Sequence, residues 1–288
     1  MITAALLHPD VDLHLLEPFQ KISPWLQIKK DLSAREDLKA VLVFGGDGTV
    51  HRYLPELHKW KIPVLVVPAG SGNDFARTLG IKNVQVALKA WRQFCGGGNN
   101  VREIDLGLVR SGGEETLFCC AAGAGLDADA NARANRMPGW LRSRGGYIVA
   151  ALWSLARRRP VMMTLRSPEL RGAGREAGQR TGPAWLLAVG NAHRYGGGLK
   201  IVPKALLDDS LLDICVVGKM NKFKLLCALP TVFWGGHIGI KQVEYFRSAD
   251  LRLESDPVLE VYADGEPVCR TPADFSVVSR ALKVIVPV

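Results

Sequence analysis

The sequence predicts a two-domain protein in which an α/β domain is followed by an all-β domain. Two units of strand, glycine-rich loop and helix lie in tandem: VLVFGGDGTVHRYLPEL from Val41 to Leu57, and VLVVPAGSGNDFARTLG from Val64 to Gly80. After Leu108 the pattern changes to short apolar runs separated by turn residues, as in antiparallel strands. The chain has 288 residues, of which 48% are hydrophobic, so it is long enough to bury two cores.

The α/β domain is expected over residues 1–107. Runs of four apolar residues predict buried parallel strands, and each run leads through glycine into a helix. This alternation predicts a parallel sheet with right-handed connections. The expected elements are strands at 41–44, 64–67 and 101–108, and helices at 49–59, 75–79 and 84–95.

The β domain is expected over residues 108–278. One helix, at about 147–159, interrupts it, and the Gly-, Arg- and Glu-rich segment 167–182 is expected to be an exposed loop. Trp185 and Trp234 are most simply core residues, and His193 a structural histidine. The expected strands are 116–121, 161–165, 184–189, 211–217, 251–253, 259–262, 275–278 and 282–286.

The two glycine-rich loops are candidates for binding phosphate. Each follows a strand and opens a helix, which places backbone N–H groups and a helix N-terminus at the carboxyl edge of the sheet. Asp47 stands out because a carboxylate near phosphate needs a metal ion or a proton-transfer task, unless it only caps the turn. The candidate residues are Gly45, Gly46, Asp47, Gly48 and Thr49 in the first loop, and Gly70, Ser71, Asn73 and Asp74 in the second.

These motifs resemble those of the diacylglycerol kinase and sphingosine kinase superfamily of lipid kinases. Besides the two loops, GAGLDADANARANR from Gly123, VGNAHRYGGGLKIVPKALLDDSLLDICVV from Val189 and VYADGEP from Val261 follow in the family's order. The resemblance implies a phosphofructokinase-like, Rossmann-type α/β domain and a C-terminal β-sandwich, with the nucleotide site in the cleft between them. It also implies that the last strand, within 279–288, returns to the first domain.

The resemblance also implies roles for particular residues. The GGDGT residues would hold the phosphates of ATP, and Ser71 lies where the family usually has a threonine that contacts nucleotide. Asp209, with the backbone carbonyls of Leu206 and Leu211, lies where bacterial members bind a structural Mg²⁺. Asp264 and Glu266 lie where the family has its candidate general base, and Asp47 would organise nucleotide and Mg²⁺.

The implied reaction is transfer of the γ-phosphoryl group of ATP to a lipid hydroxyl, most simply that of diacylglycerol, giving phosphatidic acid. Two alternatives stay open. NAD kinases also use a GGDGT motif, although their second loop usually differs. A lipid-binding protein of the same fold that has lost turnover is the other alternative.

Three departures from the family pattern bear on these alternatives. The family opens with an Asn-Pro-x-Ser-Gly loop, where this sequence has only His8-Pro9-Asp10 after Leu7. Arg52 occupies a position that is commonly glutamate. Ser210 replaces a glycine, which costs about 1–2 kcal/mol if the backbone there is left-handed.

The net charge of +9 favours acidic partners such as phosphorylated ligands or an anionic membrane. Arginines and aromatic residues interleave over 133–159, either as a membrane-contacting surface or as an ordinary solvated face.

A second segment, residues 225–240, is apolar but interrupted by Pro230 and glycines, so it either lines a lipid pocket, touches a membrane, or forms a core helix and turn. The basic and aromatic positions of the other segment, 133–159, are Arg133, Arg136, Trp140, Arg142, Arg144, Tyr147, Trp153, Arg157, Arg158 and Arg159.

Other classes of protein are disfavoured. No nucleic-acid-binding signature is present, and the six cysteines form no C-x-x-C pair, which argues against structural zinc. The first residues lack the basic segment and cleavage site of a signal peptide, so we expect a cytoplasmic protein with reduced thiols. A homodimer is compatible with the sequence, which leaves the oligomeric state open.

Overall fold

The computed structural model describes residues 3–32, 38–137, 147–170 and 178–288. The chain divides into two compact units. Unit 1 comprises Met1–Asp105 and Ser279–Val288, and unit 2 comprises Leu106–Val278. Two strands, β5 and β15, carry the chain from one unit into the other.

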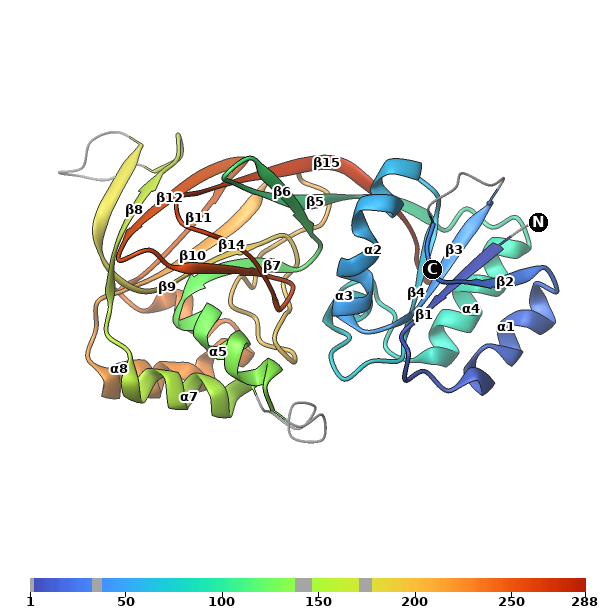
Figure 1. Cartoon of the computed structure of the whole chain (residues 1–288), viewed down its shortest axis with the longest axis horizontal. Helices are drawn as coiled ribbons and strands as arrows, with labels where there is room; N and C mark the ends of the chain where they lie inside the picture. Colours follow the sequence, from blue (N-terminus) through green and yellow to red (C-terminus); the bar gives the residue numbers. More distant parts are fainter. Residues whose placement is uncertain (1–2, 33–37, 138–146, 171–177) are drawn as a thin grey trace. The chain divides into compact units, whose positions relative to one another are not determined.

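The elements of unit 1 alternate strands with helices (Figure 1). They are β1 (Thr3–Leu7), η1 (Leu13–Leu15), α1 (Glu17–Ile22), β2 (Leu26–Lys29), β3 (Ala40–Gly45), α2 (Asp47–Trp60), β4 (Val64–Pro68), α3 (Asp74–Thr78), α4 (Val84–Cys95) and the first part of β5 (Val101–Ser111).

Unit 1 is built on a parallel sheet. Within its described residues, five strands pair in the order β2–β1–β3–β4–β15, all parallel. Strand β3 is buried along its whole length, because α2 and α3 lie on one face of the sheet and α1 and α4 on the other (Figure 1). Strand β15 (Ala273–Ile285) joins this sheet at its far end, where Val284 pairs with Val64.

Local signals explain where the helices begin and end. Helix α2 starts after Gly46, whose extended backbone precedes the first turn, and stops at Lys61 in the left-handed region. Its buried residues include Val50, Leu54 and Leu57, the spacing of a helix face that packs on a sheet. Helix α4 begins where the Asn83 side chain accepts the N–H of Val86, an ordinary N-cap.

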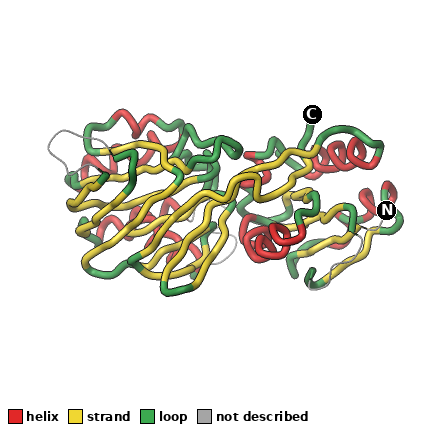
Figure 2. The backbone as a smooth tube through the Cα atoms, turned by 90° about the horizontal axis from the view of Figure 1, so that it is seen from above, coloured by secondary structure: helices red, strands yellow, loops and turns green. Residues whose placement is uncertain are grey.

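Unit 2 is built on antiparallel strands that lie side by side over most of its length (Figure 2). Its elements are the rest of β5, β6 (Glu114–Phe118), β7 (Ala121–Gly125), α5 (Leu126–Asn135), α7 (Tyr147–Arg157), β8 (Val161–Arg166), β9 (Gln179–Gly190), β10 (Leu212–Gly218), α8 (Lys222–Ala228), η3 (Leu229–Phe233), η4 (Gly236–Gly239), β11 (Val243–Ser248), β12 (Asp250–Asp256), β13 (Glu260–Ala263), β14 (Glu266–Arg270) and β15 up to Val278.

Strand β9 is the centre of this sheet. Its first half pairs with β8, and its second half pairs with β7 on one side and β10 on the other. Alternate residues of β10 face opposite cores: Ile214 and Val216 pack into one cluster, and Cys215 and Val217 into another. The second cluster also contains Leu155, so α7 and its neighbours cover that face.

Several expectations are corrected by the structure. A single strand at 116–121 is instead the end of β6, a turn and the start of β7, and the expected strands 275–278 and 282–286 are one strand, β15. Segment 167–182 is not entirely loop, because β9 begins at Gln179. Trp185 is buried as expected, but Trp234 is 65% exposed. Trp140, Arg142 and Arg144 lie outside the described residues.

No helix in the described part of the chain is long and apolar enough to cross a membrane.

Candidate active site

The glycine-rich loops of unit 1 follow adjacent strands. Strands β3 and β4 are parallel neighbours, and Gly45 pairs with Pro68 at their carboxyl ends. The strand order also reverses here, since the chain passes from β1 to β2 on one side and then to β3 on the other. In open parallel sheets, ligands bind outside the carboxyl ends of the strands at such a switch point.

The two loops touch glycine to glycine. A Cβ atom added to Gly46 would lie 2.5 Å from the carbonyl oxygen of Gly72, and one added to Gly70 would lie 2.4 Å from the Cα of Gly46. A Cβ on Gly45 would collide with the Thr49 side chain at 2.3 Å. Glycine is therefore required at Gly46 and Gly70 by close backbone approach, and at Gly45 by the Thr49 side chain.

Asp47 connects the two loops. Its backbone N–H donates to the carbonyl of Gly72 at 3.3 Å. Its carboxylate accepts the N–H of Asp74 at 3.1 Å and the N–H of Phe75 at 3.0 Å. Asp47 thus caps the first turn of α3 from a different element, and its negative charge faces the positive end of that helix.

The contacts of Asp47 determine which backbone N–H groups at the helix N-termini can still bind an anion. The first two N–H groups of α3 are already used by Asp47, whereas α2, a helix of 14 residues, begins at the same edge of the sheet. The first N–H groups of a helix have no partner within the helix and attract phosphate. At the start of α2 the N–H groups of Asp47 and Thr49 donate to the carbonyls of Gly72 and Gly46, so the N–H of Gly48 is the candidate phosphate-binding donor.

The second loop is closed by Asn73. The Asn73 Nδ2 donates to the Gly70 carbonyl at 2.8 Å, and its Oδ1 accepts the Gly70 N–H at 3.1 Å. Asp74 is fully buried and forms an ion pair with Arg77, so its role here is structural. Ser71 is exposed at the tip of the loop, where its hydroxyl is accessible to a ligand.

The first strand of the sheet ends beside these loops. The N–H of His8 donates to the carbonyl of Phe44 at 2.9 Å, which places the turn that starts at His8 next to Gly45. Asp10 is exposed and lies 3.7 Å from the His8 ring. The sequence did not predict β1, and the turn after it reads His8-Pro9-Asp10 where the family has Asn-Pro-x-Ser-Gly.

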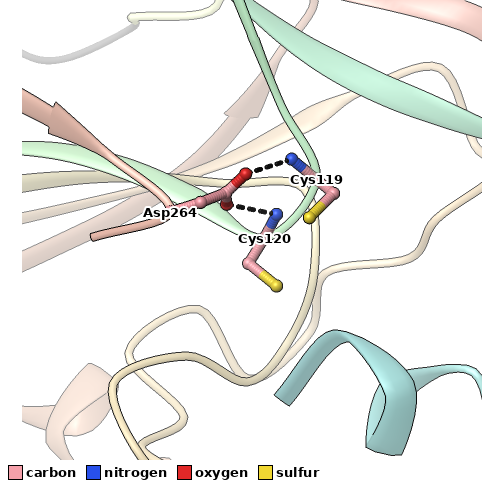
Figure 3. A group of neighbouring side chains, drawn as sticks. All are labelled: Cys119, Cys120 and Asp264. Carbon is pink, nitrogen blue, oxygen red and sulfur yellow. Dashed lines mark hydrogen bonds between the residues drawn. The ribbon is translucent and has the colours of Figure 1, made fainter. Parts of the chain in front are cut away.

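Asp264 forms a clamp in unit 2. It lies in the β13–β14 turn with φ of 49°, and its carboxylate accepts the N–H groups of Cys119 and Cys120, both at 2.8 Å, and of Ala121 at 3.2 Å (Figure 3). The carboxylate and the two buried thiols form a group that could hold a metal ion. Both carboxylate oxygens, however, already accept peptide N–H groups. The Asp264 carboxylate therefore holds the β13–β14 turn against residues 119–121, and we assign no metal ion to this group.

Glu266 differs from Asp264 in its surroundings. It is exposed at the start of β14, just beyond the turn that Asp264 fixes. An exposed carboxylate remains accessible to a substrate hydroxyl, whereas the Asp264 carboxylate is committed to three peptide donors. Of the two candidate bases, the geometry of unit 2 favours Glu266.

The candidate Mg²⁺ residues have other partners. The Asp209 carboxylate accepts the Leu211 N–H at 3.2 Å and pairs with the Arg247 guanidinium at 3.3 Å. Ser210 has φ of 58°, the left-handed conformation for which the sequence suggested a cost. Since a guanidinium already neutralises Asp209, these residues do not show the fit of a Mg²⁺ site, and no step is derived from one. The side chain of Leu206, whose backbone carbonyl is the other candidate ligand besides that of Leu211, is 53% exposed.

Asp213 lies beside this pair on β10, opposite Arg247. Its Oδ1 accepts the Tyr245 hydroxyl at 2.5 Å. Burial raises the pKa of Asp213, and burial together with the Asp213 hydrogen bond raises the pKa of Tyr245. The hydroxyl and the carboxylate therefore form a buried hydrogen bond rather than an open ligand site.

An apolar cavity lies in unit 2 between the sheet and its helices. Its volume is about 60 Å³, below the roughly 300–1,000 Å³ of ligand pockets, but its wall is almost entirely apolar. Segment 225–240 contributes to its wall, as one of the sequence interpretations proposed. The lining residues are Leu126, Ala151, Leu155, Leu186, Ile201, Val217, Met220, Leu225, Ala228, Leu229, Val232, His237 and Val243.

His237 is the polar exception in this lining, and sequence reasoning did not select it. Its Nε2 lies 2.9 Å from the carbonyl of Ile201, and burial lowers the pKa of the ring. A neutral ring that donates to a backbone carbonyl is compatible with an apolar cavity. Only its position in an apolar stretch, GGHIGI, could have drawn attention to it.

Unit 1 is thus an α/β unit with a candidate phosphate-binding site, and unit 2 an antiparallel unit with an apolar cavity. The family model of the diacylglycerol kinase catalytic domain matches residues 17–109, and that of the YegS C-terminal NAD kinase beta sandwich-like domain matches residues 120–286. The chain belongs to the diacylglycerol kinase-like lipid kinase family, with its mixed α/β N-terminal domain and β-sandwich-like C-terminal domain.

Individual relatives agree with this assignment. The chain is 38% identical over 255 residues to a diacylglycerol kinase of Mycobacterium tuberculosis, covering 86% of this chain and 77% of that protein. It is 26% identical over 261 residues to a diacylglycerol kinase of Bacillus subtilis, covering 88% and 80%.

Solved structures show the same fold. A structure described as a diacylglycerol kinase from Bacillus anthracis superposes with a TM-score of 0.66 at 20% identity, covering 99% of this chain and 96% of that one. An NAD kinase from Archaeoglobus fulgidus in complex with ATP superposes with a TM-score of 0.57 at 11% identity, covering 100% and 94%.

Proposed function

We propose that this lipid kinase transfers the γ-phosphoryl group of ATP to the hydroxyl of diacylglycerol. The observation that carries the choice of acceptor is the apolar cavity of unit 2. A wall made of aliphatic side chains and one neutral histidine suits acyl chains. It offers almost no polar groups that could bind a nucleotide such as NAD. The relative at 38% identity is a diacylglycerol kinase, which supports the same acceptor.

ATP would bind to unit 1 through its phosphates. The start of α2 and the N–H groups of Ser71 and Gly72 would neutralise phosphate charge, and Ser71 would add a hydroxyl donor. ATP would arrive as its Mg²⁺ complex, the usual substrate form in phosphoryl transfer. Asp47 would hold both loops in register rather than contact the transferred group.

Transfer itself makes one bond and breaks one. The lipid hydroxyl oxygen forms a bond to the γ-phosphorus, the bond from that phosphorus to the bridging oxygen breaks, and ADP leaves. The hydroxyl proton would pass to a carboxylate, for which we propose Glu266. Asp264 would fix the turn that presents Glu266.

The test is transfer of labelled phosphate from ATP with Mg²⁺ to lipids in mixed detergent micelles. Diacylglycerol, sphingosine, ceramide and phosphatidylglycerol are compared, and NAD is included as a soluble acceptor. Product on diacylglycerol supports the proposal. Product on NAD alone would support the NAD kinase alternative, and lipid binding without ATP consumption would support a protein that has lost turnover.

The cavity is tested by filling it. Ala151→Phe places a large side chain in the lining of α7, whereas Ala156→Phe makes the same change at an exposed position of that helix. We expect the first variant to lose activity on long-chain diacylglycerol while its melting temperature still rises with ATP, and the second to stay active. Equal activity of both variants would remove the cavity from the proposal.

A further inference from the structure

One surface of unit 2 exposes many large apolar side chains. They come from three elements that are close in space, α7, α8 and η3 with the residue after it. Phe223 is 75% exposed and Trp234 is 65% exposed, far more than a core side chain would be. This apolar face consists of Val149, Leu152, Trp153, Phe223, Leu226, Phe233 and Trp234.

The exposure follows a helical pattern. On α7, Ala150, Ala151 and Leu155 are buried, whereas Leu152 and Trp153 between them are exposed. The residues of α8 and η3 divide in the same way: the buried residues are Leu225, Ala228 and Val232, and the exposed apolar ones are Phe223, Leu226 and Phe233. These helices are therefore apolar on two sides, and only one side is covered by the rest of unit 2.

The three elements form one continuous surface. The Lys222 ammonium donates to the carbonyl of Ala156 at 2.7 Å, which attaches the start of α8 to the end of α7. Figure 1 shows α7 and α8 next to each other along one edge of unit 2. Element η3 continues directly from α8.

Positive charge surrounds the apolar face. The ring of Trp153 lies between two guanidinium groups, with the Arg133 Cζ at 3.5 Å and the Arg157 Cζ at 3.4 Å from its centroid. Lys222 and Lys224 flank Phe223 on α8. Neither α7 nor α8 contains an acidic residue.

We propose that α7, α8 and η3 dock the protein on a bilayer surface that contains anionic lipid. Aromatic and leucine side chains among lysines and arginines, without acidic residues, match the boundary between acyl chains and anionic headgroups. Exposed apolar patches of this kind mark interaction sites, and the charge favours a negatively charged surface over a neutral one.

The opposite side of the same helices strengthens this assignment. Ala151, Leu155, Leu225 and Ala228 line the apolar cavity from beneath the docking elements. A bilayer in contact with the face would lie directly over the elements that enclose the cavity. The inference gains support from the proposed lipid acceptor, but membrane binding is measured without turnover and stands or falls separately.

The test is co-sedimentation of the full chain with vesicles of phosphatidylcholine alone and of phosphatidylcholine mixed equally with phosphatidylglycerol. The wild type is expected to bind the mixed vesicles more tightly, and binding should weaken with salt. The double variant Phe223→Ser and Trp234→Ser should lower the partition coefficient about tenfold or more, because two apolar anchors are lost. Trp25→Ser, at a tryptophan that is 69% exposed in unit 1, is the matched control and should leave binding unchanged.

Charge is tested at a second pair of positions. Arg157→Gln and Lys224→Gln should each lower binding to the mixed vesicles about fivefold, with little effect on phosphatidylcholine alone. None of the substituted residues lines the cavity, so activity on diacylglycerol in detergent micelles should persist. Kinase activity that is absent while vesicle binding behaves as expected would overturn the proposed reaction and leave the docking surface in place.

Two results would overturn the docking surface. One is wild-type binding to mixed vesicles no tighter than that of the double variant. The other is a change of oligomeric state in the double variant, measured by light scattering, with vesicle binding unaltered, which would assign the face to a second copy of the chain.

Discussion

The carboxylate of Asp47 accepts the backbone N–H of Phe75 at 3.0 Å, so a residue of the first glycine loop caps the helix that follows the second. The contact makes the two loops a single structural element. It also gives Asp47 a role in stability that is separate from any contact with nucleotide.

Replacing Asp47 by alanine removes the cap of α3. We expect an activity loss of about a hundredfold or more, because the loops lose their register, and a loss of about 1 kcal/mol of unfolding free energy, typical of a helix cap. Phosphate transfer and chemical unfolding measure the two effects. Full stability with lost activity would mean that the carboxylate acts on the nucleotide rather than on the helix.

Adding a methyl group where the loops touch should be more damaging than adding one elsewhere. Gly46→Ala and Gly70→Ala are each expected to cost about 1–3 kcal/mol and to abolish the stabilisation by ATP, since the new atom meets backbone within 2.5 Å. Gly182→Ala is the matched control, because a Cβ atom added there would meet no packed neighbour within 4 Å. Thermal unfolding with and without ATP compares the three proteins, and equal ATP effects in all of them would argue against a phosphate site at this contact.

The two acidic residues of the β13–β14 turn should separate catalysis from stability. Glu266→Gln is expected to lower kcat by about a hundredfold or more with an unchanged melting temperature, as for an exposed general base. Asp264→Asn should lower stability by about 1–3 kcal/mol, because an amide nitrogen would face peptide donors. The reverse outcome, a stable but inactive Asp264→Asn and an active Glu266→Gln, would make Asp264 the base.

Buried His237 predicts a fall in stability as the solution becomes acidic. Its pKa is lowered in the folded state, so its contribution is complete above the unfolded value of 6.5 and is lost as the pH falls below it. His237→Gln keeps a donor for Ile201 and should flatten the dependence of unfolding free energy on pH, by at most about 1.4 kcal/mol per pH unit.

The control for this experiment is the exposed His14. Glu17 raises its pKa through a hydrogen bond, so its contribution is present at low pH and lost as the pH rises. His14→Gln should therefore not flatten the acid side of the profile. Burial also lowers the pKa of His193, so His193 adds to the slope of unfolding free energy against pH with the same sign as His237. Part of the wild-type slope should therefore remain in His237→Gln. An unchanged slope in that variant would exclude His237 as the source.

Removing Mg²⁺ from the nucleotide-free protein should leave its melting temperature unchanged, because Arg247 already neutralises Asp209. In Arg247→Gln the carboxylate loses this partner, and added Mg²⁺ should then stabilise the protein. A chelator that destabilises the wild type, with the effect absent in Asp209→Asn, would instead establish the metal site that the family resemblance implies.

The sequence predicted the parts of the fold that depend on local signals. Helix α4 was expected at 84–95 and is observed at those residues, because Asn83 caps it and glycines follow it. The strand at 121–125 could not be recognised in the same way. Its residues, AAGAG, have low strand propensity, and pairing with β9 and β13 holds them extended.

The candidate site was predicted as a set of residues but not as a set of contacts. The GGDGT motif identified the loop, yet nothing local indicates that Asp47 caps a helix 27 positions later. The clamp from Asp264 to Cys119 joins residues 145 positions apart. Trp234 was assigned to the core from its hydrophobicity, and its exposure depends on how η3 packs, which one sequence does not reveal.

The path of β15 has a consequence for how the protein is made. Residues 279–288 complete the parallel sheet of unit 1 and leave the ribosome after all of unit 2. Until then Val64 lacks its β15 partner Val284, and the Asn100 amide lacks the Val286 carbonyl to which it donates at 3.0 Å. Unit 1 therefore cannot finish folding first, and a chain released early would contain every residue of the glycine loops without the strand that completes their sheet.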